Sequence, residues 1–165
     1  MLIRAATSDD LPAIARLLVE CNATYVEFAP AGWRAVPYEM QLEHERQALS
    51  LPERWVAVGE QGGVVVAYAA FVDARLTRVP VNEPGLAHLG RLFVDPSHWG
   101  SGAAVTMHAR ALDEAAARDF TAIRLFTPTA HGRARRFYER EGWQAVGEAP
   151  GLGFGMPLTE YRRDL

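Results

Sequence analysis

The sequence predicts an α/β fold, a mixed sheet of about seven strands flanked by about four helices, and three observations support it. Short strand patterns alternate with helical patterns along the chain. One strand runs into a glycine-rich loop that opens a helix. The chain has 165 residues, of which 49% are hydrophobic and 22% charged, an ordinary composition for a globular protein of this size. We therefore expect residues 1–165 to form a single domain.

The first 50 residues predict one strand and two helices. Residues 1–6 alternate weakly, as a strand does. Thr7–Asp10 combines hydroxyl caps with acids, which favours a helix start, and apolar residues follow at helical spacing as far as Cys21. Residues 22–37 are irregular and rich in aromatics and proline, and residues 38–50 predict a second helix with a charged face.

The middle of the chain predicts three strands. Arg54–Gly59 and Val64–Asp73 flank a turn at Gln61–Gly63. A loop that contains prolines then leads to a fourth strand, Ala87–Val94, which ends before Pro96.

The C-terminal part predicts two helices and three strands. A helix follows the glycine-rich loop, and Ala122–Phe126 is the next strand. Gly132–Glu141 is a short helix closed by a glycine, and Trp143–Val146 and Gly155–Thr159 complete the sheet. The helix after the glycine-rich loop has apolar residues on one side, namely Val105, Ala109, Leu112 and Ala116.

Charge, cysteine content and hydropathy exclude several classes of protein. The net charge is −3, so the chain lacks the basic surplus of a nucleic-acid-binding protein. The single cysteine, Cys21, cannot form an internal disulfide and is expected to be a buried, inert thiol. The longest apolar stretch, Val64–Val72, is too short to span a bilayer, and Arg4 and Asp9 interrupt any signal-like run. We expect a cytoplasmic protein with neither membrane nor nucleic-acid partners.

The most informative segment is residues 89–104, which read Leu-Gly-Arg-Leu-Phe-Val-Asp-Pro-Ser-His-Trp-Gly-Ser-Gly-Ala-Ala. Gly100 and Gly102 carry no side chain to block a ligand and can adopt a positive φ. Ala103 and Ala104 keep the first helical turn bare, where free N–H groups lie at the positive end of the helix dipole. A pyrophosphate suits such a site. The alternative is a tight turn without a ligand, and the loop matches neither the Walker nor the Rossmann pattern.

A second segment, residues 131–143, reads His-Gly-Arg-Ala-Arg-Arg-Phe-Tyr-Glu-Arg-Glu-Gly-Trp. Together the two segments resemble the GNAT acetyltransferase family, whose first motif runs Leu-x-Val-x-Pro, a spacer, then Arg/Gln-x-x-Gly-x-Gly/Ala, and whose second runs Asn-x-x-Ala-x-x-x-Tyr-x-x-x-Gly-Phe. The start of the chain, Ile3–Leu11, is also similar to this family. Trp99 departs from the usual Arg or Gln, and His131 from the usual Asn. The matching residues are Leu92, Val94, Pro96, Gly102, Ala104, Ala134, Tyr138, Gly142 and the aromatic Trp143.

The resemblance implies a GNAT-like fold with acetyl-CoA as cosubstrate. In such a fold the strands Ala87–Val94 and Ala122–Phe126 are parallel and splay apart, and the freed backbone can bond the pantetheine arm. The alternative for these residues is plain burial in a strand. The residues expected to contact acetyl-CoA are Leu92, Phe93, Val94, Trp99, Gly100, Ser101, Gly102, Ala103, Ala104 and His131.

Acetyl transfer to an amine needs a base and an acid, because an alkylammonium with a pKa of about 10.4 is mostly protonated at neutral pH. The resemblance implies that Tyr138 is the acid that reaches the CoA sulfur, although core packing is an alternative role. His88 stands where some members carry a glutamate, and it is the candidate base. We expect it to share a strand face with Gly90 and Leu92. The alternative is that His88 is an ordinary half-buried histidine and that Glu83 or water acts as the base.

Other chemistry is not expected. His44, His98 and His108 have no metal-ligand spacing with one another or with Cys21, so we expect no metal. Ser101 lacks a His/Asp partnership, which leaves direct transfer as the mechanism.

The acceptor site in this family is walled by the first two helices with their link and by the loop before the last strand, here about residues 22–45 and 147–155. Aromatic and acidic side chains in the first stretch would suit a cationic amine. The alternative is that the aromatic side chains pack in the core and the acidic ones face solvent. These residues are Tyr25, Glu27, Phe28, Trp33, Tyr38 and Glu39.

The expected function is acetylation of a small-molecule amine. The alternatives are acetylation of a protein N-terminus or lysine, and a non-catalytic acyl-CoA-binding module. A closed aromatic pocket would favour the small molecule, and an open acidic groove the protein. The sequence leaves a homodimer open.

Overall fold

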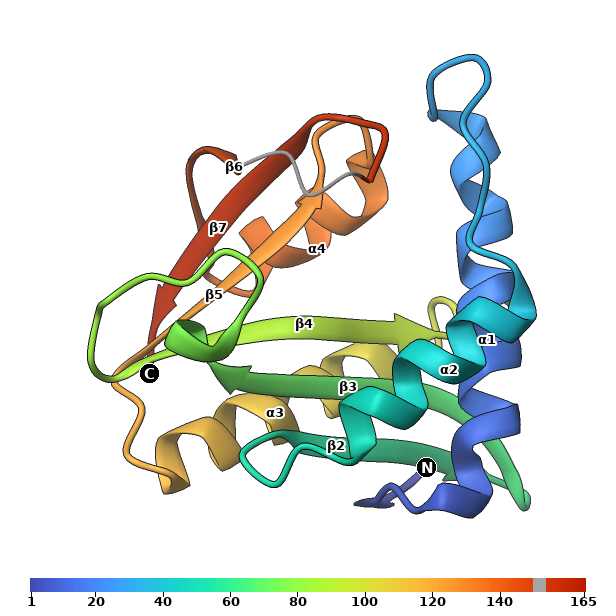
Figure 1. The fold of residues 1–165 in the computed structure, drawn as a ribbon, viewed down its shortest axis with the longest axis horizontal. Coiled ribbons are helices and arrows are strands. Elements are labelled where there is room, and N and C mark those ends of the chain that lie inside the picture. The colour runs from blue at the N-terminus through green and yellow to red at the C-terminus, as the bar shows by residue number, and fades with distance from the viewer. Residues whose placement is uncertain (150–153) are drawn as a thin grey trace.

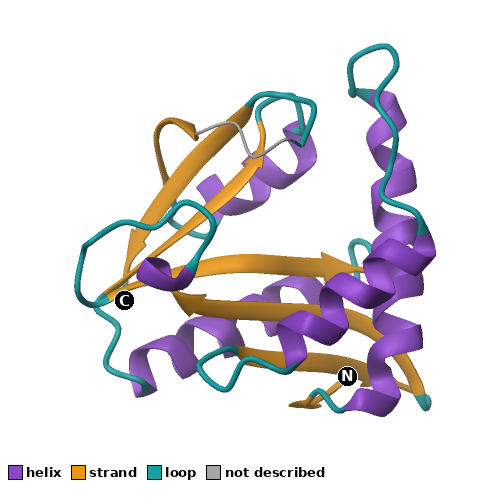
Figure 2. Cartoon of the chain, viewed as in Figure 1, coloured by secondary structure: helices purple, strands orange, loops and turns teal. Residues whose placement is uncertain are grey.

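Residues 1–149 and 154–165 are described in the computed structural model, and they form a seven-stranded mixed sheet with four α-helices (Figure 1, Figure 2). The strand order is β1-β2-β3-β4-β5-β7-β6, and only the β4–β5 pair is parallel. The predicted α/β fold is confirmed. The strands are β1 (Leu2–Ala5), β2 (Trp55–Gln61), β3 (Val64–Asp73), β4 (Leu86–Val94), β5 (Ala122–Pro128), β6 (Gln144–Ala149) and β7 (Leu158–Asp164). The helices are α1 (Leu11–Ala23), α2 (Tyr38–Leu49), α3 (Ala103–Ala117) and α4 (Gly132–Arg140).

Helices cover both faces of the sheet (Figure 1). On one face, Ile14 and Leu18 of α1 form a buried cluster with Tyr68 of β3. On the other, Met107 of α3 belongs to a larger cluster that includes Phe71, because successive residues of a strand point to opposite faces. Within the described ranges, none of the helices combines the length and apolarity needed to cross a membrane.

α3 buries a different side from the predicted one. Its buried positions include Ala103, Met107, Ala111 and Ala115, which recur every four residues. The predicted apolar side is largely exposed, with Val105 at 42%. Alanines occur on all sides of this helix, so apolarity alone does not single out the side that meets the sheet.

β4 and β5 pair over three positions only, from Leu86 with Ala122 to His88 with Arg124. Beyond His88 the two strands diverge (Figure 1), which confirms the predicted splay. From Leu89 onward, β4 therefore has no strand partner on its β5 side.

A β-bulge interrupts β4 at Gly90. Phe71 and Ala70 are consecutive in β3, but their partners Leu89 and Arg91 are not, so Gly90 is an extra residue. The register of every later residue of β4 is shifted by one position.

The bulge changes which side chains of β4 lie on one face. His88 and Arg91 both face α1 and α2, whereas Leu92 packs against the cluster under α3. The expectation that His88 shares a face with Leu92 is therefore wrong, because one extra residue reverses the alternation of a strand.

The last strand extends further along the chain than predicted. β7 ends at Asp164, and its polar residues are stabilised by ion pairs such as Arg162 with Glu160, at 2.8 Å. The loop at about residues 147–155, expected to wall the acceptor site, falls partly outside the described residues, which omit 150–153.

Candidate active site

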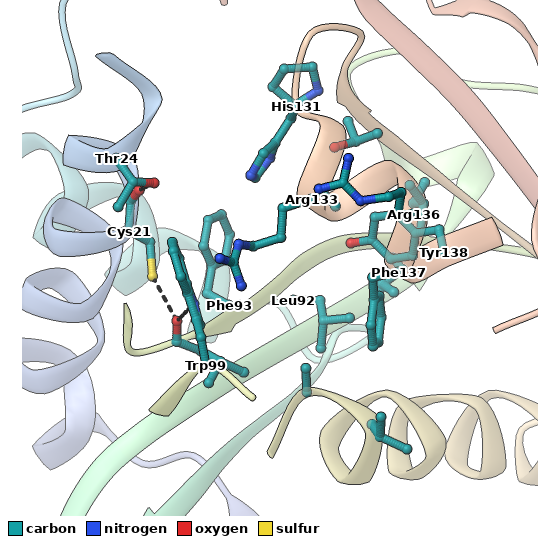
Figure 3. Close-up of a pocket in the computed structure, with 18 of the residues that line it drawn as sticks. Cys21, Thr24, Leu92, Phe93, Trp99, His131, Arg133, Arg136, Phe137 and Tyr138 are labelled. Atoms are coloured by element: carbon teal, nitrogen blue, oxygen red, sulfur yellow. Dashed lines mark hydrogen bonds between the residues drawn. The ribbon is translucent and has the colours of Figure 1, made fainter. Parts of the chain in front are cut away.

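A cavity of about 650 Å³ opens where β4 and β5 separate (Figure 3). Both strands line it, together with the β4–α3 loop, α4, Cys21 of α1 and Tyr25 in the turn that follows α1. Three arginines of α4 also line it, Arg133, Arg136 and Arg140, whereas no aspartate or glutamate of the described residues does. This charge favours an anionic ligand.

Most residues predicted to contact acetyl-CoA line this cavity. Two do not. Ala103, the first residue of α3, is buried against the sheet, and the Ser101 hydroxyl donates to the His98 carbonyl at 2.7 Å. The residues that line it are Leu92, Phe93, Val94, Trp99, Gly100, Gly102, Ala104 and His131.

The glycine loop leaves the start of α3 open. Gly100 and Gly102 adopt φ values of +83° and +88°, a region that favours glycine. A Cβ atom at either position would meet nothing within 4 Å, so the space beside the loop is free. Because the first N–H groups of α3 have no partner within the helix, the loop can bind a phosphate group.

A cation lies over the ring of Trp99, the residue that stands where the family usually has Arg or Gln. The Arg133 guanidinium lies 4.2 Å from the centroid of the Trp99 ring. Arg133 extends from α4 toward Trp99 (Figure 3), so the positive charge comes from another element. Arg133 is not among the residues predicted for this site. The signal that could have found it is the run of arginines one turn before Tyr138.

The Val94 carbonyl at the end of β4 accepts two hydrogen bonds. The Trp99 indole N–H donates at 2.9 Å and the Cys21 thiol at 3.3 Å, as Figure 3 shows. Burial, followed by the charges of Asp95 and Glu20, raises the pKa of Cys21 to about 12. The predicted burial of this thiol is confirmed.

The Tyr138 hydroxyl reaches the cavity from α4 (Figure 3). The residue is 9% exposed, and its ring packs against Trp143 and Tyr161, with centroid distances of 5.7 and 6.0 Å. Burial, and then the charge of Tyr25, raises the pKa of Tyr138 above its ordinary value. The phenol therefore keeps its proton at neutral pH, so it can donate this proton to a ligand.

His88 does not itself line the cavity, but it lies beside two residues that do, Gly90 and Phe126. A Cβ atom on Gly90, which lines the cavity, would be 3.6 Å from the His88 ring, and the Phe126 ring is 4.9 Å away. Burial, and then the charges of three nearby arginines, lowers the pKa of His88 to about 3. The ring is neutral at pH 7 but binds a proton weakly.

Aromatic side chains form a wall between α1 and the start of α4. Tyr25 packs against Phe28, Trp33 and His131, with centroid distances of 5.1, 5.9 and 5.1 Å. His131 stacks on Phe28 at 4.7 Å, and burial followed by the charge of Arg133 lowers its pKa to about 4. We call Tyr25, Phe28, Trp33, His131 and Phe154 the aromatic wall.

The acids expected beside these aromatics lie elsewhere. Glu27 and Glu39 are exposed, so the aromatics pack with one another and the acids face solvent. Glu83 is paired with Arg162 at 2.9 Å. In residues 1–149 and 154–165, no group of three His, Cys, Asp or Glu side chains is placed to hold a metal ion.

Solved structures share this fold. yncA from Salmonella typhimurium, determined with its cofactor acetyl-CoA, is 26% identical with a TM-score of 0.70 over 99% of this chain and 93% of that one. A ribosomal-protein-alanine N-acetyltransferase from Brucella melitensis is 23% identical, with a TM-score of 0.71 over 100% of both chains. An aminoglycoside 6′-N-acetyltransferase complexed with coenzyme A is 15% identical, with a TM-score of 0.73 over 99% of this chain and 97% of that one.

A search of curated proteins gave no significant match. The model of the acetyltransferase (GNAT) family matches residues 15–143, which include the β4–α3 loop and α4. The chain therefore belongs to the GNAT family and is an acetyl-CoA-dependent N-acetyltransferase.

Proposed function

We propose that this enzyme transfers the acetyl group directly to the primary amine of a small molecule, with residues 1–165 acting as one domain. The observation that carries the proposal is the cavity itself. Tyr25 and His131 of the aromatic wall line it, whereas none of the described acidic side chains does. A lysine or N-terminus of a basic protein would instead suit an open acidic groove. Structures with this fold include enzymes named for a ribosomal protein and for an aminoglycoside, so the fold alone does not distinguish protein substrates from small-molecule substrates.

The residues present fit acetyl-CoA. The open N-terminus of α3 suits the pyrophosphate, Arg133 and Arg136 add positive charge, and the unpaired edge of β4 suits the amide groups of the pantetheine arm. When bound, acetyl-CoA supplies the acetyl group and a thiolate leaving group.

Tyr138 is proposed as the acid. It holds a proton at its hydroxyl oxygen, and it can pass this proton to the departing sulfur and regain one from solvent. Its burial excludes water from the site where the thiolate would form.

His88 is proposed as the hydrogen-bond acceptor for the amine. Its neutral ring can accept from the nitrogen, while water removes the proton, since a group with a pKa of about 3 is a weak base at pH 7. Glu83 is held by Arg162, so we do not assign it this role.

A coupled assay of CoA release tests the proposal. The panel should contain amino acids, polyamines, aminoglycosides, and peptides with a free N-terminus or a lysine. We expect at least one small amine to exceed every peptide tenfold in kcat/KM. Turnover of peptides alone would overturn the substrate class. Binding of acetyl-CoA without turnover of any amine would indicate a non-catalytic module.

A further inference from the structure

Three arginines surround His88 on the face of the sheet that α1 and α2 cover. Arg54 precedes β2, Arg91 follows the bulge in β4, and Arg124 lies beside His88 in β5. All three are near enough for their charges to lower the pKa of His88, after the larger effect of burial.

Of these three arginines, only Arg91 forms an ion pair with a residue that the structure describes. Its guanidinium donates to one carboxylate oxygen of Glu45 at 2.9 and 3.0 Å, and Glu45 is 1% exposed. The other oxygen of Glu45 accepts from the Tyr68 hydroxyl at 2.5 Å. Both oxygens of Glu45 are therefore engaged, and this acid is committed to Arg91 and Tyr68.

Arg124 is a buried cation without an acidic partner. It is 1% exposed, and within the described ranges no carboxylate lies within 4.0 Å of it. Its guanidinium donates to the Val79 carbonyl and the Thr77 hydroxyl, and its Nε atom is buried without a partner. The nearby acids Glu83 and Glu160 are both bonded to Arg162.

Arg54 adds a second unpaired cation. Its side chain makes no ion pair with the described residues, and its Nε atom is buried without a hydrogen-bond partner. The Nδ1 atom of His88 is also buried and unpartnered. Unsatisfied buried charges and donors are costly, and an anion bound among Arg54, Arg124 and His88 would remove this cost.

This cluster adjoins the cavity but lies far from the phosphate loop. Arg54, His88 and Arg124 do not themselves line the cavity, but Gly90 and Phe126 do. The Phe126 ring centroid lies 4.9 Å from that of His88, and a Cβ atom on Gly90 would lie 3.6 Å from the His88 ring. His88 and Val94 are six residues apart along β4, roughly 20 Å at the rise of a strand. The cluster is therefore separate from the site proposed for the pyrophosphate of acetyl-CoA.

We propose that the acceptor amine also carries a carboxylate, as an amino acid does, and that Arg54 and Arg124 bind this carboxylate beside His88. Two guanidinium groups match the two oxygens of a carboxylate. Such an anchor would hold the amine of a small acceptor near the point where β4 and β5 separate. This inference rests on the proposed function, whose substrate it narrows.

The test compares L-amino acids with their amides and with the corresponding decarboxylated amines, measured as CoA release. We expect kcat/KM for the best acid to exceed that of its amide by at least tenfold. Arg54→Gln should raise KM for that acid about 10- to 100-fold, as expected when a charge-assisted hydrogen bond is lost. The matched control is Arg46→Gln, an arginine of α2 that is 56% exposed. It should keep the preference for the acid.

Arg124→Lys supplies a second variant, which keeps the charge but loses the Nε donor. Its melting temperature shows whether it folds, and it should also lower the preference for the acid. Equal turnover of acids and amides by the wild type would overturn the inference while leaving the proposed function intact. A preference for aminophosphonates over amino acids would also overturn it.

A binding measurement separates the two hypotheses if no amine is acetylated. Calorimetry with the CoA-saturated protein would then titrate each L-amino acid directly. Binding to the wild type that is weakened at least tenfold in Arg54→Gln, but not in Arg46→Gln, would support the carboxylate site even though the proposed function had failed. No binding of any amino acid would overturn both.

Discussion

The guanidinium of Arg133 lies 4.2 Å from the Trp99 ring centroid, and the Trp99 indole N–H donates to the Val94 carbonyl at 2.9 Å. The ring is thereby anchored to the end of β4, and it holds the cation at the cavity wall. We expect Arg133→Ala to weaken acetyl-CoA binding about tenfold, and less at high salt. Calorimetry measures this change. Arg110→Ala, at an exposed arginine of α3, is the control, and equal affinity in both variants would refute the role of Arg133.

The glycine loop gives a second prediction. Acetyl-CoA should raise the melting temperature of the wild type, because a ligand that binds only the folded state stabilises it. Gly102→Glu should abolish this rise by filling the open space and repelling pyrophosphate. Gly62→Glu is the matched control, since Gly62 also has a positive φ and open space around it but lies in the β2–β3 turn. A normal rise in Gly102→Glu would place the phosphates elsewhere.

Tyr138→Phe should lower kcat by roughly 10²- to 10⁴-fold if the hydroxyl is the general acid. The ring contacts with Trp143 and Tyr161 are retained in this variant, so its melting temperature and KM for acetyl-CoA should change little. Steady-state kinetics with the best amine measures both constants. Near-normal turnover would assign Tyr138 to packing alone.

His88 should not titrate near neutral pH, because its pKa is lowered to about 3. Between pH 5.5 and 8 we expect kcat/KM to rise only with the fraction of unprotonated amine. His88→Gln should lower its magnitude but keep the shape of the profile. A rising limb near pH 6.5 that disappears in the variant would instead identify His88 as a general base.

His108 should make the fold sensitive to acid. It is 2% exposed, its Nε2 atom accepts from the Trp143 indole N–H at 2.9 Å, and burial followed by the charge of Arg163 lowers its pKa to about 4. Between about pH 6.5 and pH 4 the unfolded chain binds a proton that the folded chain does not, so stability falls as the pH falls.

From this one group we expect a loss of about 2 kcal/mol between pH 7 and pH 5. Urea unfolding at both pH values measures the loss, and His108→Gln should reduce it even though the variant is less stable at pH 7. An unchanged pH dependence in His108→Gln would show that other groups cause the loss.

Local sequence pattern predicted the order of all the helices and strands and the positive φ of Gly100 and Gly102. Each of these depends on residues that are neighbours in the chain, such as an apolar period or a glycine between a strand and a helix. The separation of β4 from β5 was predicted from the resemblance of two spaced motifs to a known family. The charged end of β7 was missed because it lacks an apolar pattern, and because Arg162 pairs with the distant Glu83 as well as with Glu160.

Tertiary structure decided which side chains meet. The bulge at Gly90 places Arg91 on the face of His88 and moves Leu92 to the other. A glycine inside a strand can mark a bulge, but only the pairing with β3 shows that Gly90 is an extra residue. Arg54 and Arg124 come together with His88 from three different strands or their ends, although they are far apart in sequence. The spacing of residues in the sequence determines which helix or strand forms. Burial and charge depend on contacts between different elements, and these contacts exist only in the folded protein. That is why the sequence alone indicated an acetyltransferase, and why the arginines proposed to select its substrate became visible only in the fold.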